Sequence, residues 1–308
     1  MNKSILLKEI NNKILEDIKD LNLFAVVLPF QKVSVENIDM IRKILGEKVS
    51  IEVLFTCFEG KKLQDKFPEA IPVEVEGKEI NISNYHPVSP INPQIHDHLL
   101  TELNKLKDMS INTVWLNHLH FPTKWWVNDP QILDTDYSDM ALSAFSRYIG
   151  EDIEGSNLEE KFLHIDGSYY HEWLLFKSSF INSFVEKAKS LLNPSGIEVG
   201  AILVPWEEKD YRAAITRVLG QDHSVLVDLA DKLALSLPYN QMGMDNEWVK
   251  AKINYFWHLG RKFTSFVDVD DNQNDFEQLI PILLQMPSDG FVLDSYKDLT
   301  SYEIKYLK

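Results

Sequence analysis

Segment 114–126, VWLNHLHFPTKWW, starts as an apolar run and ends in amide, imidazole and indole groups. His118 and His120 are two residues apart, so an extended backbone would point both rings to the same side. Aromatic faces stack on sugar rings, and amide and imidazole groups hydrogen-bond to hydroxyls. We therefore expect five residues of this segment to bind substrate: Asn117, His118, His120, Trp125 and Trp126.

Acidic residues follow other short apolar runs, and these are the candidates for catalysis. Beside a sugar-binding surface, one carboxyl group can act as general acid and another as general base. We expect Glu207, Asp268 and Asp294 to provide this pair. Trp206 and Tyr239 also follow apolar runs, so we expect them to extend the substrate-binding surface.

Each of these features also has an interpretation without catalysis. Acidic residues at 207 and 208 suit the N-terminus of a helix, and the acidic run 267–275 suits the cap of a following helix. That run lacks the glycine of a calcium loop. Tryptophans after strand ends also pack between a barrel and its helices. The pair His118 and His120 suits a metal ion, but no third ligand is evident beside it, so we expect no metal site.

Short apolar runs alternate with helical patterns along most of the chain, as in parallel sheets covered by helices. We count about eight candidate strands, at 23–29, 50–57, 80–85, 114–117, 197–204, 232–237, 262–269 and 290–293. This number favours an α/β fold with a single (β/α)8 TIM barrel over a doubly wound sheet. In such a barrel the carboxyl ends of the strands form the active site, which is where the candidate residues would meet.

The remaining segments complete the predicted architecture. Residues 4–20 carry apolar residues at helical spacing, so we predict an extra N-terminal helix within residues 1–20, packed on the barrel. Residues 72–82 alternate around Gly77 like a small hairpin, residues 151–170 look irregular, and a last helix is expected after residue 293. Because no linker-like change in composition interrupts the chain, we expect residues 1–308 to form one domain.

Composition narrows the possible partners. The chain of 308 residues has 47 acidic and 31 basic residues, a formal net charge of −16 that repels phosphate backbones and anionic lipids. Nucleic acid and membranes are therefore not expected partners, and without a signal-peptide core or membrane span we expect a cytoplasmic protein.

A single cysteine, Cys57, excludes an internal disulfide. Glycine-rich phosphate motifs are absent, and we expect no cofactor. The oligomeric state is left open.

Four stretches resemble segments of a bacterial glycoside hydrolase-like family with a TIM-barrel fold. In chain order they are PVEVEGKEINISNYHPVSPINPQ, INTVWLNHLHFPTKWW, VGAILVPWEEKDYRAAITRVLGQD and LALSLPYNQMGMDNEWV, and the likeness spans roughly residues 50–300. The resemblance implies a barrel that hydrolyses a glycosidic bond and takes a carbohydrate as its substrate.

One position departs from the family's pattern. The family strand, of the form dGIwLDFiRfP, has an aspartate where this chain has Asn117 and an arginine where it has His120. An amide neither exchanges a proton near neutral pH nor acts as a good nucleophile. Two alternatives to hydrolysis by the acidic residues therefore stay open. One is a carbohydrate-binding pseudoenzyme that has lost hydrolysis, and the other is a metal-dependent hydrolase that uses His118 and His120.

Overall fold

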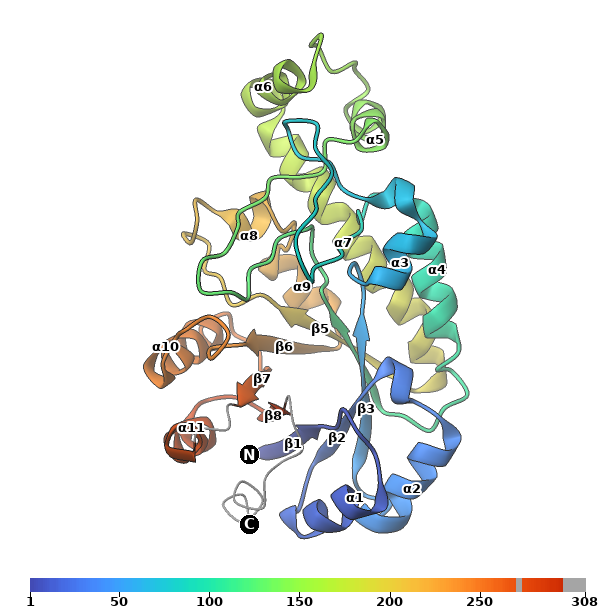
Figure 1. Cartoon of the computed structure of the whole chain (residues 1–308), viewed down its shortest axis with the longest axis vertical. Helices are drawn as coiled ribbons and strands as arrows, with labels where there is room; N and C mark the ends of the chain where they lie inside the picture. The colour runs from blue at the N-terminus through green and yellow to red at the C-terminus, as the bar shows by residue number, and fades with distance from the viewer. Residues whose placement is uncertain (270–272, 296–308) are drawn as a thin grey trace.

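The centre of the molecule is a closed barrel of eight parallel strands (Figure 1). The computed structural model describes residues 1–269 and 273–295. Each strand pairs with its neighbours in the sequence, and β8 pairs with β1 to close the barrel. The prediction of a single (β/α)8 barrel is confirmed. The strands are β1 (Asn2–Leu6), β2 (Ala25–Pro29), β3 (Ser50–Thr56), β4 (Thr113–Asn117), β5 (Glu198–Leu203), β6 (Lys232–Leu237), β7 (Thr264–Val269) and β8 (Gly290–Ser295).

Helices surround the barrel and connect its strands. The start and end of α2 show how local sequence sets their bounds: the Ser34 side chain accepts a hydrogen bond from the N–H of Asn37, and Gly46 ends the helix with a φ of 95°. Among the described helices, none combines the length and apolar composition needed to cross a membrane. The α-helices are α1 (Asn12–Ile18), α2 (Val35–Leu45), α3 (Lys61–Lys66), α4 (Pro93–Asn104), α5 (Asp139–Ile149), α6 (Leu158–Ser168), α7 (Tyr170–Leu192), α8 (Ala214–Arg217), α9 (His223–Leu229), α10 (Asn246–Trp257) and α11 (Gln273–Gln285).

The N-terminal segment differs from its prediction. Residues Asn2–Leu6 form β1, and α1 begins only at Asn12, so the segment supplies the first strand and first helix of the barrel rather than an extra helix. β1 pairs with both β2 and β8. These long-range hydrogen bonds outweigh the helical spacing of the apolar side chains. The predicted strand at 80–85 is also wrong, because Ile82 and Tyr85 form only an isolated bridge there.

Three other predictions have separate outcomes. The hairpin at 72–82 is present as a bridge between Val73 and Glu79, with Gly77 at a φ of 78°. Residues 151–170, predicted to be irregular, contain α6. The helix predicted after residue 293 lies almost wholly outside the described residues.

One apolar layer fills the middle of the barrel. It takes one residue from each strand, namely Leu6, Val27, Leu54, Trp115, Ile202, Ala234, Phe266 and Val292. Trp115 is the largest of them, and its ring packs edge-on against Phe266 at a centroid distance of 5.5 Å. Gly200 makes room for this ring, because a Cβ atom at Gly200 would lie 2.2 Å from it. The layer separates the two ends of the barrel interior.

A long loop, residues 118–138, follows β4 and leads into an extension made of α5, α6 and the start of α7 (Figure 1). Lys177 of α7 fixes this loop near both of its ends. Its buried ammonium group donates hydrogen bonds to the carbonyls of Thr135 and Arg217, and it lies 4.7 Å from the ring centre of Phe121. The loop that carries Trp125 and Trp126 is thereby held against the barrel.

Candidate active site

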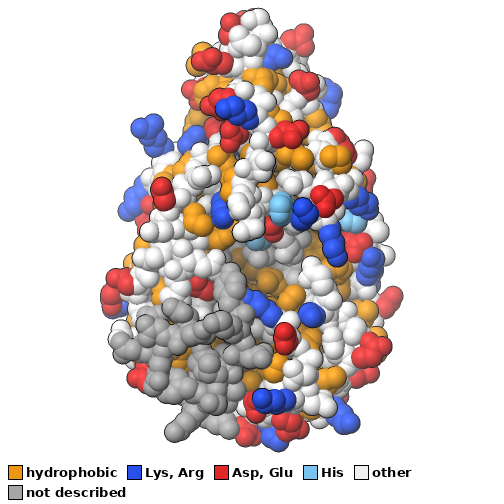
Figure 2. Space-filling model, viewed as in Figure 1, with side chains coloured by type: hydrophobic (Ala, Val, Ile, Leu, Met, Phe, Trp, Pro, Cys, Tyr) orange, Lys and Arg blue, Asp and Glu red, His pale blue; other side chains and the backbone are white. Residues whose placement is uncertain are grey.

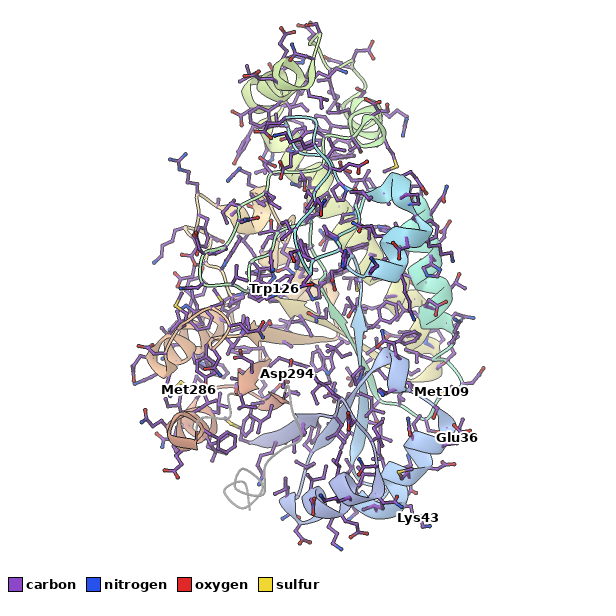
Figure 3. The ribbon with its side chains drawn as sticks, viewed as in Figure 1. Glu36, Lys43, Met109, Trp126, Met286 and Asp294 are labelled. Atoms are coloured by element: carbon purple, nitrogen blue, oxygen red, sulfur yellow. The ribbon has the colours of Figure 1, made fainter. Side chains whose placement is uncertain are left out.

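A pocket of about 280 Å³ opens at the carboxyl ends of the strands. The face drawn in Figure 2 is hollowed near its centre, and Figure 3 labels two of the lining residues, Trp126 from the loop after β4 and Asp294 from β8. Five of the seven predicted substrate-binding residues and one of the three predicted carboxylates line the pocket. The lining consists of Glu59, Asn117, His118, His120, Trp125, Trp126, Ile202, Leu203, Val204, Ser236, Pro238, Gln241 and Asp294.

His120 is a buried, neutral residue whose two ring nitrogens are both occupied. Nε2 lies 3.2 Å from Nε1 of Trp125, and because an indole nitrogen only donates, His120 Nε2 must accept. The proton is therefore on Nδ1, which donates to the carbonyl of Phe121 at 2.7 Å. Burial lowers the pKa of His120 to about 4. His120 thus orients Trp125 and is not free to exchange protons or to bind a metal ion.

His118 is less constrained by its neighbours. It follows β4 with a φ of 50°, a left-handed conformation that turns the chain at the strand end. Burial lowers the pKa of its imidazole to about 3, and the nearby His120 contributes to this shift, so the ring is neutral near pH 7. Nδ1 is buried without a hydrogen-bond partner among residues 1–269 and 273–295. A neutral imidazole that lines a pocket can hydrogen-bond to a sugar hydroxyl.

Aromatic rings form one wall of the pocket. Trp126 contacts three other rings edge-on, with centroid distances of 4.9 Å to His118, 5.2 Å to Tyr85 and 5.9 Å to Trp125. Tyr85 accepts a hydrogen bond from the N–H of Thr123 at 3.0 Å, which ties the loop to the segment after β3. These contacts hold the Trp126 ring in a fixed orientation at the pocket, as a sugar-stacking surface requires.

Asp268 and Asp294 stand side by side at the carboxyl ends of β7 and β8, at paired positions. Paired residues of neighbouring strands lie about 4.8 Å apart and point to the same side. Asp268 is buried and accepts hydrogen bonds from the N–H groups of Asn240 (3.4 Å) and Gln241 (3.3 Å). Burial raises the pKa of Asp268 to about 7, and the charge of Asp294 adds to the rise.

The carboxylate of Asp294 has a cation, Lys8, beside it. The ammonium group of Lys8 lies 2.7 Å from Oδ1 of Asp294, and this ion pair balances the charge of the carboxylate at the pocket wall. Lys8 was not predicted as a site residue, because residues 4–20 were interpreted as a helix. As the strand that ends at Leu6 is β1, Lys8 comes just after a strand end, like the other site residues.

Glu59 is a second residue that sequence reasoning did not select. It follows β3 and lines the pocket. Burial raises the pKa of its carboxyl group, while a hydrogen bond from the backbone of His86 and the charge of that histidine oppose the rise. The signal was present in the sequence, since Glu59 comes three residues after the last residue of β3, but it did not differ from that of other acidic residues at strand ends.

Glu207 does not line the pocket. Its side chain pairs with Lys252 at 3.1 Å and with Lys209 at 3.1 Å. Burial alone would raise the pKa of Glu207, but the hydrogen bonds and charges of Lys209 and Lys252 outweigh it and lower the pKa. A carboxylate held by two cations is poorly suited to donate a proton.

Two predicted sugar-binding residues also lie outside the pocket lining. Trp206 is 2% exposed and belongs to an apolar cluster with Trp125, Val204 and Met242. Tyr239 is 1% exposed and packs in the main hydrophobic core. Both side chains pack in apolar clusters, and their role in sugar binding stays a prediction.

Known proteins were compared with the chain by sequence and by structure. No family model matches it, and no curated protein sequence matches it. The glycoside hydrolase domain of PgaB (BpsB) from Bordetella bronchiseptica has a TM-score of 0.69 at 10% identity, over 95% of this chain and 93% of that chain. The catalytic domain of β-amylase from Paenibacillus polymyxa has a TM-score of 0.60 at 11% identity, over 98% and 94%. A β-galactosidase from the haloarchaeon Halorubrum lacusprofundi has a TM-score of 0.64 at 10% identity, over 98% of this chain and 54% of that chain.

The chain therefore has the fold of glycoside hydrolase catalytic domains. Likeness at this level of identity establishes a fold and leaves the chemistry to be argued from the site. The resemblance to one particular family, and the replacement of that family's aspartate by Asn117, stay predictions.

Proposed function

We propose that this protein hydrolyses a glycosidic bond in the pocket at the carboxyl ends of the strands. The observation that carries the proposal is the grouping of acidic side chains in different environments around one aromatic pocket: Glu59 and Asp294 line it, and Asp268 is buried beside Asp294. Pairs of carboxyl groups whose environments favour different protonation states are typical of glycoside hydrolysis. The fold of the structural neighbours supports the same reaction class.

The environments suggest a role for each carboxyl group. Glu59, whose pKa is raised by burial, is the general acid that protonates the leaving oxygen. Asp294, paired with Lys8, is the carboxylate that activates water or attacks the sugar. Asp268, whose pKa is raised by burial to about 7, is protonated below neutral pH and there avoids a second negative charge beside Asp294. Glu207, predicted as a catalytic residue, has no role in this scheme.

The ligand is a carbohydrate held by the β4 segment. Trp126 stacks on a sugar ring, and Asn117 and His118 hydrogen-bond to its hydroxyls. His120 and Trp125 act together, because the hydrogen bond between them fixes both rings in the wall.

The metal-dependent alternative loses support, because both nitrogens of His120 are engaged. Among the described residues, no group of three or more His, Cys, Asp or Glu side chains is arranged to hold a metal ion.

The carbohydrate-binding alternative has one observation in its favour, since the amide of Asn117 occupies the inward position at the end of β4. A screen of chromogenic glycosides and oligosaccharides separates the two functions. We expect product release by the natural protein and its loss in Glu59→Gln and Asp294→Asn. Release only by Asn117→Asp, together with a sugar-dependent change in tryptophan fluorescence of the natural protein, would instead show a binding protein that has lost hydrolysis.

A further inference from the structure

Strands β4 and β5 stop pairing with each other before their carboxyl ends, where both line the pocket. Their last paired residues are Leu116 and Ala201. On the other side of β4 the hydrogen bonding continues, because the carbonyls of Asn117 and His118 accept hydrogen bonds from the N–H groups of the two residues after β3, at 2.9 and 3.3 Å. Six residues from the ends of β4 and β5 line the pocket, namely Asn117, His118, His120, Ile202, Leu203 and Val204.

The side chain of Gln221 lies between these two strand ends and bridges them. It is fully buried, and its amide bonds only to backbone groups among the contacts of residues 1–269 and 273–295. Nε2 donates to the carbonyls of Leu119 at 3.0 Å and Ile202 at 3.3 Å, and Oε1 accepts from the N–H of Val204 at 2.9 Å. An amide in this orientation matches two carbonyls and one N–H. One side chain therefore takes the place of the hydrogen bonds that β4 and β5 no longer make to each other.

The main chain at Gln221 is held by the segment between α8 and α9. Its N–H donates to the carbonyl of Ile215 at 3.0 Å. The next residue, Asp222, is the N-cap of α9, and its side chain accepts hydrogen bonds from the N–H groups of Ser224 at 3.0 Å and Val225 at 3.3 Å. The amide of Gln221 thus reaches the strand ends from a fixed support.

The hydrogen bond to Leu119 bears directly on how the two histidines face the pocket. Asn117 and His118 are adjacent and both line the pocket, which a regular strand does not allow, and the φ of 50° at His118 makes this change of direction. Leu119 then points into the main hydrophobic core, and His120 lines the pocket again. The carbonyl of Leu119 belongs to the peptide group that joins it to His120, so the bond from Gln221 fixes the orientation of that group.

We propose that Gln221 is a positioning residue of the pocket, which fixes the separation of the β4 and β5 ends and thereby presents His118 and the pair of His120 and Trp125 to the ligand. Gln221 does not line the pocket, so it acts through the residues that it holds. The proposal rests on the proposed function in one respect, namely that the ligand is a sugar whose hydroxyls meet this wall.

NMR of the protein without ligand tests the positioning role. Gln221→Met keeps the approximate size of the side chain and removes its three hydrogen bonds. We expect the imidazole signals of His118 and His120 to shift. The indole proton of Trp125 donates to His120, and we expect its signal to move upfield as that bond weakens. The indole signal of Trp115, in the apolar layer, should move much less.

Gln221→Glu is a milder variant that reports on the same role if Gln221→Met does not fold. Burial favours the neutral form of a carboxyl group at this position. That form has one O–H donor and one carbonyl acceptor, so it can keep two of the three hydrogen bonds. We expect the same signals to shift in the same direction by a smaller amount.

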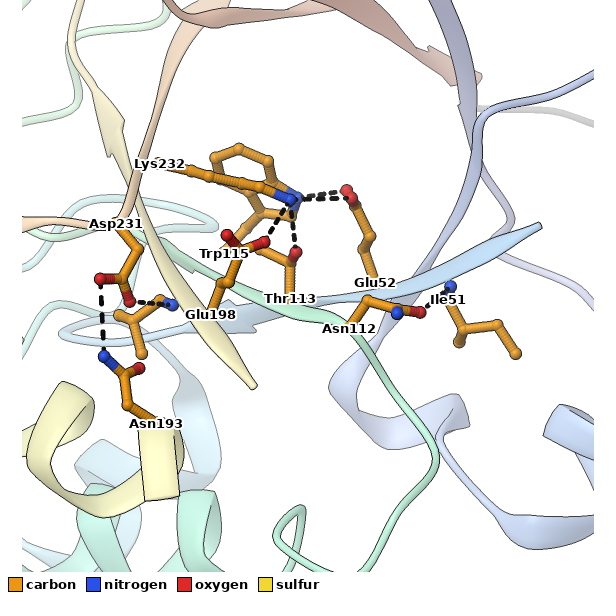
Figure 4. Close-up of polar contacts among 10 residues, drawn as sticks. Ile51, Glu52, Asn112, Thr113, Trp115, Asn193, Glu198, Asp231 and Lys232 are labelled. Carbon is orange, nitrogen blue, oxygen red and sulfur yellow. Dashed lines mark hydrogen bonds and ion pairs between the residues drawn. The ribbon is translucent and has the colours of Figure 1, made fainter. Parts of the chain in front are cut away.

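Asn112→Leu is the matched control. At the opposite end of the barrel, Oδ1 of Asn112 accepts a hydrogen bond from the N–H of Ile51 at 2.9 Å, so this side chain also joins two neighbouring strand segments (Figure 4). We expect its loss to leave the His118, His120 and Trp125 signals in place, since the apolar layer lies between the two ends.

Three results would overturn the positioning role. They are pocket signals that stay unchanged in the folded Gln221 variants, an equal shift of the Trp115 signal, and an equal shift of the pocket signals in Asn112→Leu. Because no sugar is present in these measurements, an absence of hydrolysis in the glycoside screen would refute the proposed function and leave their outcome unaffected.

Discussion

Asp268 and Asp294 show how two aspartates of one site come to differ. Asp294 faces the pocket with Lys8 beside it, whereas Asp268 is 5% exposed and has backbone N–H groups as its partners. Burial disfavours the charged form of Asp268, and the charge of Asp294 at the paired strand position adds to this effect, so Asp268 keeps its proton to higher pH. The pKa of about 7 for Asp268 is the physical signature of this arrangement.

The pH dependence of the unfolding free energy should reveal the proton that Asp268 binds in the folded state. An unfolded aspartate loses its proton near the reference pKa of 3.8, and folded Asp268 only near 7. Between these values the folded state binds the extra proton, so the contribution of Asp268 to the unfolding free energy falls as pH rises. Asp268→Asn resembles the protonated form, and its stability relative to the natural protein should rise with pH by at most about 1.4 kcal/mol per unit. Urea unfolding of both proteins between pH 4.5 and 8 measures this difference, and parallel curves would rule it out.

The roles of Glu59 and Glu207 can be separated by matched substitutions. Glu59→Gln removes the proton donor at the pocket, so we expect turnover of any substrate to fall by about 10²- to 10⁴-fold. Glu207→Gln changes a carboxylate that pairs with Lys209 and Lys252 outside the pocket, and turnover should stay within about twofold. Initial rates at saturating substrate provide the comparison. Equal losses in the two variants would contradict the assignment of Glu59.

Part of the site could be predicted from sequence and part could not, for physical reasons. Asn117 is the last residue of an apolar strand and His118 follows it directly, so their place at the barrel end is a local property. Whether a side chain near a strand end faces the pocket or the helices is decided by packing. That is why Trp206 and Glu207 were selected and lie outside the lining, while Glu59 was passed over.

At the scale of elements, the loop after β4 is positioned by the segment after β5. The N–H of Phe121 donates to the carbonyl of Leu219 at 2.9 Å, and its ring lies against Gly220. The ammonium group of Lys177 on α7 donates a hydrogen bond to each segment, to the carbonyl of Thr135 in the first and to that of Arg217 in the second. The aromatic wall of the pocket is therefore built by contacts among three elements that are far apart in the sequence.

Gly220→Ala tests this contact. Gly220 has a φ of 64°, and a Cβ atom there would lie 2.9 Å from the Phe121 ring. We expect a loss of about 2–4 kcal/mol in unfolding free energy, from the left-handed backbone and the clash together. Gly150→Ala is the control, since Gly150 has a φ of 76° with nothing within 4 Å of the added Cβ, and it should lose only about 1–2 kcal/mol. Similar losses in the two variants would show that the Phe121 contact is unimportant.

The N-terminal segment was predicted wrongly because its apolar pattern is ambiguous. The apolar residues of the segment before Asn12 fit both a short strand and a helix, and the choice is made by pairing with β2 and β8. The strand β6, at Lys232–Leu237, agrees with its prediction, and it lies between the end of α9 at Leu229 and turn residues at 239–243. Local patterns thus gave the number of strands but took one of them from the wrong place, which also concealed Lys8.

At the scale of the whole molecule, the central apolar layer fills the interior of the closed barrel and separates its two ends. Trp115 fills the space left by Gly200 on β5, and the two residues are paired in register. The ring also carries the hydrogen bond to Glu52 below the layer, while Asn117, two residues further along β4, lines the pocket above it. One strand therefore serves both ends of the barrel.

Gly200→Ala should disturb this layer. The added Cβ would lie 2.2 Å from the Trp115 ring, and overpacking of this kind costs about 1–3 kcal/mol or more. Gly167→Ala is the matched control, because Gly167 lies in α6 with open space around the added Cβ, and the change should stabilise the helix by about 0.5–1 kcal/mol. Thermal and urea unfolding of both variants measure the effects. A neutral result at Gly200 would mean that the Trp115 ring is free to move aside.

The central claim is that water cleaves a glycosidic bond in the pocket lined by Glu59, Trp126 and Asp294. The most direct measurement is the uptake of oxygen from ¹⁸O-labelled water into released sugar, followed by mass spectrometry. We predict one labelled oxygen for each bond cleaved by the natural protein, and none above background for the Glu59→Gln, Asp294→Asn double variant. A sugar that binds and quenches tryptophan fluorescence without any labelled product, or label uptake that persists in the double variant, would contradict the account.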